Sequence, residues 1–330
     1  MSKTNDPEVN VIRHEISGKH AWRRADLIES DWLVQLDDQA VAEIDAALEA
    51  LRTQPVPLLA LRPSSFPLPA CKAAMNRVRN ILNDGVRFCL IRGLPIARMS
   101  DDEARAIYWL LSSMVGRPVA QKLDGTMVYD VTDTGAKALP SSGVRPDKTN
   151  IDLAFHNDNA YNNNMPDVVG LLCIRASQSG GTSRVMSFAT VHNALLDVAP
   201  DAMERLYDSF PFDRQREFAA GESPIFEAPM FVNAHGTLKA RLGLHQVRNG
   251  YEMTEPMDAS ARDAIDALET VFAKPELQFE FDMQPGDIQF AKNCEVGHSR
   301  TEFVDYPDPE KKRLLVRLWL RDNGLQGYIG

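Results

Sequence analysis

Cysteine is scarce in this sequence, and its placement fits neither a disulfide framework nor a cysteine-rich metal site. The 330 residues include four cysteines, which are widely separated and form no C-x-x-C pair: Cys71, Cys89, Cys173 and Cys294. Cys89 and Cys173 stand inside apolar runs that are typical of strands. We therefore expect reduced, buried thiols, as in most cytoplasmic proteins.

Long hydrophobic runs and an excess of positive charge are also missing. No apolar run approaches the roughly 18 residues that span a bilayer. The first ten residues, MSKTNDPEVN, lack the apolar region of a signal peptide. The net charge is −10 and there is no basic run, which argues against a nucleic-acid partner. We expect a cytoplasmic protein whose partner is a small molecule rather than a membrane or a nucleic acid. A homo-oligomer is compatible with this sequence.

The first third of the chain has helical periodicity. Hydrophobic residues recur three and four positions apart over 37–52 and 70–85. Ser100 and Glu103 form a capping box that begins a further helix. A short apolar run at 86–95 predicts a strand between these helices.

After Gly116 short strands and turns dominate, with helices predicted over 190–196, 201–208 and 259–274. Residues 223–247 read as a hairpin with its turn at 234–236. This order predicts a mainly β core with flanking helices (α+β), and it does not favour βαβ units. We expect one domain over 1–330, with a mainly helical part at 1–116 and, at 117–330, a β core that carries a helical insert.

One loop, residues 132–150, is rich in Gly, Pro, Ser and Thr and has no hydrophobic period. A loop this long inside a compact domain is usually disordered or functional. We interpret 133–150 as a lid over a binding site.

The segment that follows, FHNDNAYNNN at 155–164, contains a His and an Asp separated by one residue. In an extended chain His156 and Asp158 lie on the same side, about 7 Å apart, while Asn157 points away. An imidazole and a carboxylate that converge are two-thirds of a 2-His-1-carboxylate site for Fe(II). The alternative is an Asn-rich surface loop, with Asn162–Asn164 as turn formers.

The C-terminal run RLLVRLWLRD alternates between arginines and apolar residues. Leu314, Val316, Leu318 and Leu320 share one face, and the other face carries Arg313, Leu315, Arg317, Trp319 and Arg321. If the apolar face packs on helices, the arginines point inward, where a buried guanidinium requires an acidic partner. The alternative is an edge strand with solvated arginines.

Taken together, FHNDNAYN, DVVGLLCIRASQSGGTS and QPGDIQF, followed by GHSRTEFVDYPDPEKKRLLVRLWL, resemble the taurine dioxygenase/TfdA-like family of Fe(II)- and 2-oxoglutarate-dependent dioxygenases. The resemblance covers residues 86–322. It implies a double-stranded β-helix core, a jelly-roll and cupin-like arrangement.

The resemblance also implies residue roles. His156, Asp158 and His298 would bind iron, and Arg313 would grip the far carboxylate of 2-oxoglutarate. Arg317 matches the family's second arginine, which lies nearer the metal-bound end of 2-oxoglutarate or the substrate. Two residues match a further 2-oxoglutarate contact, Ser183 and its neighbour Thr182.

Two positions depart from the family pattern. Asn157 stands where relatives often have Thr, and we expect little chemical effect because it points away from the metal. Gly297 stands where Leu is common, and we expect this to enlarge the pocket floor. Asp158 is retained, which argues against halogenation, because halogenating relatives replace this carboxylate.

The implied reaction is oxidation of an unactivated C–H bond, by hydroxylation or desaturation. It is coupled to O2-dependent decarboxylation of 2-oxoglutarate to succinate and CO2. The substrate is expected to be a small polar or natural-product-like molecule. Candidate substrate contacts are Asn159, Tyr161, Arg241, His245 (expected on a strand) and Arg317, with Arg248 and Arg145 as further partners for an anion.

Two other functions remain open on the sequence. One is a non-catalytic β-barrel protein that binds a small organic acid. The other is a Zn-dependent hydrolase that uses the same three ligands. Arg313 distinguishes the hydrolase from the oxygenase, because a hydrolase does not need it.

Overall fold

Two β-sheets face each other at the centre of this computed structural model, which describes residues 10–136 and 146–329. The larger sheet has the order β1-β2-β14-β6-β17-β3, and β4 also pairs with β17. Its strands are β1 (Leu33–Gln35), β2 (Phe88–Arg92), β3 (Arg117–Val119), β4 (Tyr129–Val131), β6 (Val168–Arg175), β14 (Ile288–Lys292) and β17 (Leu314–Arg321).

The smaller sheet has the order β13-β8-β15-β5. Its strands are β5 (Leu153–His156), β8 (Ser183–Ser187), β13 (Phe279–Phe281) and β15 (Val296–Arg300). Side chains of both sheets meet between them, where Phe88 of the larger sheet packs with Val185 and Val296 of the smaller one. Short pairs complete the strands, among them β7 (Ser179–Gly180) with β16 (Phe303–Val304).

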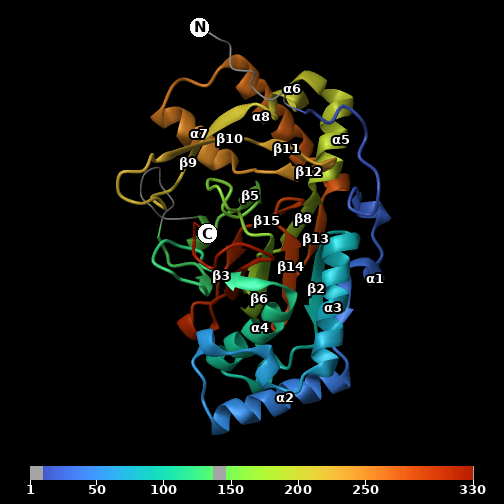
Figure 1. The fold of residues 1–330 in the computed structure, drawn as a ribbon, viewed down its shortest axis with the longest axis vertical. Helices are drawn as coiled ribbons and strands as arrows, with labels where there is room; N and C mark the ends of the chain where they lie inside the picture. Colours follow the sequence, from blue (N-terminus) through green and yellow to red (C-terminus); the bar gives the residue numbers. More distant parts are fainter. Residues whose placement is uncertain (1–9, 137–145, 330) are drawn as a thin grey trace.

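Helices of the N-terminal part cover the outer face of the larger sheet (Figure 1). They are α2 (Asp38–Thr53), α3 (Pro69–Asp84) and α4 (Asp101–Val115), whereas the short α1 (Glu29–Trp32) lies beside β1 and β2, with Trp32 packed against Phe88. Helices α2, α3 and α4 match the predicted helices, and the Ser100 capping box is present, with the Ser100 N–H donating to Glu103 at 2.8 Å. These helices share a hydrophobic core with β6, β14 and β17. That 1–330 form one domain stays a prediction.

Strand β17 has the orientation that its alternation predicts. Its apolar face, which includes Leu318 and Leu320, packs in the same core as the helices. On the opposite face Arg313, Arg317 and Arg321 are only 3–7% exposed. The alternative of a solvated edge strand is therefore wrong.

A second group of helices and strands lies between β8 and β13 in the chain and at the opposite end of the molecule from α2 (Figure 1). It consists of α5 (Phe188–Val198), α6 (Pro200–Arg205), β9 (Ser209–Asp213), β10 (Ile225–Pro229), β11 (Phe231–Ala234), β12 (Thr237–Ala240), α7 (Leu244–Met253) and α8 (Ala259–Phe272). The hairpin turn between β11 and β12 is confirmed, and His235 and Gly236 both have positive φ there.

The predicted strand through residue 247 is wrong at its end, because α7 begins at Leu244. Leu244, Val247 and Tyr251 are buried at helical spacing. His245 is therefore on a helix rather than on a strand.

The cysteines are free, and Cys71, Cys89 and Cys173 are buried, as predicted, whereas Cys294 is half-buried. Among the described helices, none combines the length and hydrophobicity that a bilayer span requires.

Gly170 on β6 allows β6 to pack closely against α4 and β14. A Cβ at this position would lie 2.5 Å from the Tyr108 hydroxyl oxygen and 2.7 Å from Phe290 Cε1. Both neighbours are fully buried, so neither can move away cheaply. We expect Gly170→Ala to lower the free energy of unfolding by about 1–3 kcal/mol, measured by denaturant titration. Gly327→Ala, whose Cβ would meet nothing within 4 Å, is the control. Equal effects of the two substitutions would contradict this packing argument.

Candidate active site

His156, Asp158 and His298 converge at one end of the smaller sheet. His156 ends β5 and lies directly opposite His298 on the antiparallel strand β15. Asp158 follows two residues later. Its Oδ1 lies 3.7 Å from His156 Nε2 and 3.6 Å from His298 Nε2. The convergence predicted from the sequence is therefore present.

The protonation states suit a metal ligand set. Burial lowers the pKa of His156 to about 4, so its imidazole is neutral at pH 7. Its Nδ1–H donates to the Ala154 carbonyl at 2.8 Å, which leaves the Nε2 lone pair facing Asp158. Burial alone would raise the pKa of Asp158, but Arg317 and the two histidines hold it well below its usual range. Asp158 is therefore an ionised carboxylate beside a neutral imidazole donor.

These three side chains fit a single divalent ion. The distances of 3.7 and 3.6 Å from Asp158 Oδ1 to the two Nε2 atoms are within the roughly 4 Å that can separate two ligands of one ion at about 2 Å from each. Two imidazoles and one carboxylate on one side of a metal define the facial site of non-haem Fe(II) oxygenases, with the remaining positions open.

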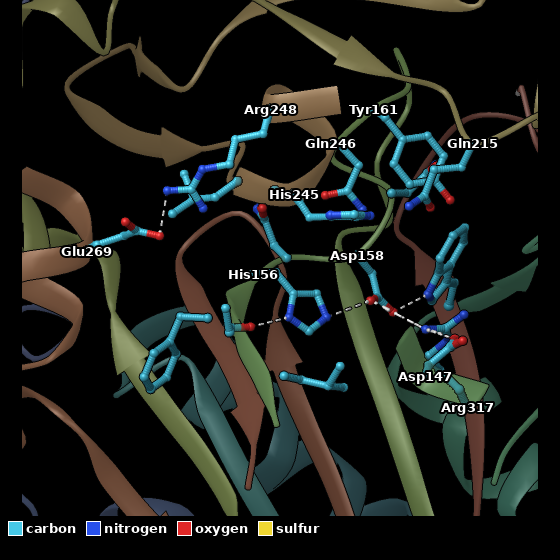
Figure 2. Close-up of a pocket in the computed structure, with 18 residues that line it drawn as sticks. Asp147, His156, Asp158, Tyr161, Gln215, His245, Gln246, Arg248, Glu269 and Arg317 are labelled. Carbon is cyan, nitrogen blue, oxygen red and sulfur yellow. Dashed lines mark hydrogen bonds and ion pairs between the residues drawn. The ribbon is translucent and has the colours of Figure 1, made fainter. Parts of the chain in front are cut away.

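The second oxygen of Asp158 is also held. Trp319 Nε1 donates to Oδ2 at 2.7 Å, and Arg317 Nη1 lies 3.2 Å from the same atom (Figure 2). Arg317 further pairs with Asp147 at 3.2 Å and donates to Gln121 at 2.8 Å. The sequence placed Trp319 on the inward face of β17 but did not reveal this contact.

Asn157 is buried and does more than separate the two ligands. Its Nδ2 donates to the carbonyls of Ala240 at 2.6 Å and Asn293 at 2.9 Å, and its Oδ1 accepts from Leu242 N at 2.6 Å. Asn293 in turn exchanges two hydrogen bonds with the backbone of Asp158. Asn157 uses these hydrogen bonds to fix the loop that carries Asp158. Neither this role of Asn157 nor the contribution of Asn293 was predicted from the sequence.

Arg313 is 5% exposed at the start of β17, and its guanidinium packs 5.0 Å from the centre of the Phe303 ring. Arg300 contacts the same ring at 4.5 Å. Within residues 10–136 and 146–329, no carboxylate forms an ion pair with Arg313. Burial lowers the pKa of Arg313 to about 10, which leaves the group cationic at pH 7. A buried cation of this kind calls for an anionic ligand.

The two predicted 2-oxoglutarate contacts, Thr182 and Ser183, have different surroundings. Thr182 lines a cavity of about 300 Å³ together with Arg313, but its hydroxyl donates to Asp282 at 2.7 Å. Ser183 is buried on β8 and is paired with Arg300 of β15. Their roles toward 2-oxoglutarate stay predictions.

A pocket of about 230 Å³ is lined by two of the three candidate ligands, His156 and Asp158. Helix α7 contributes His245, Gln246 and Arg248 to its wall (Figure 2). Arg248 forms an ion pair with Glu269 of α8 at 2.8 Å, and both side chains are nearly half exposed. The pocket therefore presents charges of both signs beside a candidate metal centre.

Of the predicted substrate contacts, Tyr161, His245 and Arg317 line this pocket. Asn159 also lines it, but its side chain is engaged in the loop, where Oδ1 accepts from Asn162 and from the Tyr328 hydroxyl. Asn162 is buried, so its interpretation as a surface turn former is wrong.

Arg241 does not line the pocket. Its guanidinium donates to the carbonyls of Ala160 and Asn162, against the prediction of a substrate contact. Arg145 lies outside the described residues, as do residues 137–144 of the predicted lid. Of that segment, 132–136 and 146–150 are described.

The expectation for Gly297 is also wrong. A Cβ there would lie 2.6 Å from Phe188 Cε1, so the phenyl ring fills the space that a larger side chain would need. The missing side chain does not enlarge the pocket.

The fold and this site define an Fe(II)/2-oxoglutarate-dependent dioxygenase, and comparison with known proteins agrees. The model of the taurine catabolism dioxygenase TauD, TfdA family matches residues 54–319, so the chain belongs to that family.

Individual relatives are more distant. The chain is 27% identical over 328 residues to an FR-33289 synthase of Streptomyces rubellomurinus, covering 96% of this chain and 94% of the relative. It is 26% identical over 242 residues to an L-asparagine oxygenase of Streptomyces coelicolor, covering 65% of each.

Solved structures share the fold. An asparagine oxygenase in complex with Fe(II), 3-hydroxyasparagine and succinate superposes with a TM-score of 0.65 at 21% identity, covering 88% of this chain and 94% of that one. The oxygenase OrfP in complex with Fe and alpha-ketoglutaric acid gives 0.64 at 17% identity, with the same coverage.

Asn157 offers a test of the loop that carries Asp158. Asn157→Ala removes three buried hydrogen bonds and leaves their backbone partners without a donor or acceptor. We expect the free energy of unfolding to fall by about 2–4 kcal/mol in denaturant titration. Asn163→Ala, at an exposed position of the same segment, should have little effect. If Asn157→Ala were as stable as Asn163→Ala, Asn157 would not hold the loop.

Proposed function

We propose that the protein hydroxylates an unactivated C–H bond of a small polar substrate, with Fe(II) bound by His156, Asp158 and His298. The observation that carries this proposal is the convergence of the three candidate ligands beside a pocket of about 230 Å³, which His156 and Asp158 line. A substrate in that pocket lies beside the metal positions that the protein leaves free. When bound, iron and 2-oxoglutarate supply the oxidising chemistry, and the chain's residues bind, orient and exclude water.

We assign the far carboxylate of 2-oxoglutarate to Arg313, with Ser183 and Thr182 as further contacts. The assignment is supported by the burial of the guanidinium and by its lack of an ion-pair partner among the described residues. A guanidinium binds a carboxylate through two parallel hydrogen bonds, which offsets the cost of its burial. Arg317 cannot take this role as readily, because Asp158, Asp147 and Gln121 already engage it.

Arg313 and the ligand set together disfavour the two alternative functions. A Zn-dependent hydrolase has no use for a buried arginine that is held away from the metal ligands. A protein that only binds an organic acid does not need two histidines and a carboxylate that converge on one position. The oxygenase accounts for both features.

The core fits the double-stranded β-helix that the family implies. From β4 to β8 the chain alternates between the larger and the smaller sheet, apart from the short β7. Strands β13, β14, β15 and β17 alternate between the two sheets in the same way. Alternation of this kind is the strand order of a jelly roll. We therefore assign the fold to the jelly-roll, cupin-like class, with the sheets open rather than closed into a barrel.

We further propose that the substrate is a zwitterion such as a free amino acid or an amino-acid-like molecule. The Arg248–Glu269 pair at the pocket rim offers one charge of each sign. Arg241 donates to backbone carbonyls and does not line the pocket. Arg248 of α7 does line it, and its cationic side chain can bind a substrate anion. The solved structures with hydroxylated asparagine and hydroxylated arginine support the same substrate class.

The first test is turnover of 2-oxoglutarate. The wild-type protein should form succinate from 2-oxoglutarate with Fe(II) and O2, slowly even without substrate. Arg313→Ala should raise the KM for 2-oxoglutarate at least tenfold, because it removes a charge-assisted hydrogen-bonding pair of about 1.5–3 kcal/mol. Arg52→Ala, which removes an ion pair between Arg52 of α2 and Glu103 of α4, away from the candidate site, is the control and should match the wild type. Unchanged KM in Arg313→Ala would remove Arg313 from the co-substrate site.

The second test is substrate recognition. With a panel of amino acids, a substrate should accelerate succinate formation in the wild type. Arg248→Ala should raise the concentration needed for that acceleration at least tenfold, since the substrate anion loses its partner. The KM for 2-oxoglutarate should stay unchanged. Arg262→Ala, an exposed arginine on the neighbouring α8, is the matched control. Identical responses of the two variants would contradict the role given to Arg248.

A further inference from the structure

The two oxygens of the Asp158 carboxylate have different surroundings. Oδ1 faces the Nε2 atoms of His156 and His298 at 3.7 and 3.6 Å. Oδ2 faces β17, where it accepts from Trp319 Nε1 at 2.7 Å and lies 3.2 Å from Arg317 Nη1. Arg317 Nη1 also donates to Oδ1, at 3.5 Å, so the hydrogen bond from Trp319 is the contact that distinguishes the two oxygens. Figure 2 shows Asp158 between the histidine on one side and the β17 side chains on the other.

The different surroundings of the two oxygens determine whether the carboxylate can bind a metal through one oxygen or through both. The terminal torsion of an Asp side chain has broad energy wells, so an unrestrained carboxylate can turn both oxygens toward one ion. An aspartate that binds through both oxygens occupies an additional metal position. The facial triad requires those positions for co-substrate and oxygen, so one oxygen must be kept away from the metal.

Trp319 is better suited to this task than Arg317. The indole N–H is a single donor with no acceptor capacity, and its direction is fixed by a ring that is only 1% exposed. The ring also stacks on Tyr328, with centroids 6.4 Å apart and planes at 19°. In contrast, Arg317 Nη1 is divided between Asp158 and Asp147, each at 3.2 Å.

We propose that Trp319 is a positioning residue that holds Asp158 Oδ2 and so keeps the carboxylate bound to the metal through Oδ1 alone. The inference rests on the proposed iron site. Without the indole N–H, Oδ2 loses its shortest hydrogen bond and the carboxylate can rotate toward the ion. Both the affinity for the metal and the coordination geometry should then change.

The test is Co(II) titration of the metal-free protein, followed by visible absorption, because Co(II) reports its coordination number directly in that spectrum. Trp319→Phe keeps an aromatic ring but removes the donor. We expect Co(II) to bind about 10–100-fold more weakly, the usual result of losing an outer-shell partner, with an altered absorption spectrum. Wild-type affinity together with a wild-type spectrum would overturn the proposal.

A matched control separates positioning from general destabilisation. Trp22 is similarly buried, and its Nε1 donates at 2.8 Å to the Val86 carbonyl, away from the candidate ligands. Trp22→Phe should lose stability while its Co(II) spectrum stays that of the wild type. An equal spectral change in Trp22→Phe would show that Trp319 acts only through overall packing, and would also overturn the proposal.

Two further outcomes are decided in advance. If Trp319→Phe does not fold, Trp319→Tyr takes its place, because its hydroxyl cannot reach the position of the indole nitrogen and the same spectral change is expected. A wild-type protein that binds no Co(II) would contradict the iron site itself. If the wild-type protein binds Co(II) and the Trp319 variant has the same affinity and spectrum, only the role of Trp319 is contradicted.

Discussion

The negative charge of Asp158 is the constraint on which the site depends. The carboxylate is 5% exposed, and a buried charge is tolerated only where partners offset the loss of hydration. Trp319 contacts one of its oxygens, the two histidines face the other, and Arg317 reaches both. Arg317 also pairs with Asp147, so the charged side chains that lead away from the candidate ligands follow the order Asp158, Arg317, Asp147. A divalent cation at Oδ1 would complete this balance.

Both sheets contribute to that arrangement. The smaller sheet supplies the ligands, because β5 and β15 place His156 opposite His298. The larger sheet supplies the groups that hold them, because β17 is covered by helices on one face and carries Arg313, Arg317 and Trp319 on the other. The segment between β8 and β13 supplies α7 and α8, and these helices bring Arg248 and Glu269 to the pocket. In the proposed function, ligation, co-substrate binding and substrate binding thus fall to different parts of the chain.

Much of this could be predicted from short-range patterns. The i, i+2 spacing of His156 and Asp158 and the alternation of β17 depend only on strand geometry, and both are present. The end of the predicted hairpin was wrong. Apolar and polar residues still alternate in TLKARLGLHQV, although the buried residues of α7 already follow a helical period. In that segment the local sequence is compatible with both a strand and a helix.

Contacts between distant residues could not be predicted. The hydrogen bond from Trp319 to Asp158 joins residues 161 positions apart, and the bonds between Asn293 and Asp158 join residues 135 apart. Arg241 had the chemistry of a substrate ligand, but backbone carbonyls of the 160–162 loop engage it. Gly297 suggested free space, which Phe188 fills from the insert. In each case the tertiary fold supplied a partner that no local pattern identifies.

The most direct test of this account is an anaerobic titration of the wild-type protein with Fe(II) and 2-oxoglutarate, followed by visible absorption. The account predicts a weak charge-transfer band that requires both additions, because 2-oxoglutarate chelates an iron held by His156, Asp158 and His298. Asp158→Ala should abolish the band at the same concentrations. A wild-type protein without the band, or an Asp158→Ala variant that retains it at full intensity, would contradict the central claim.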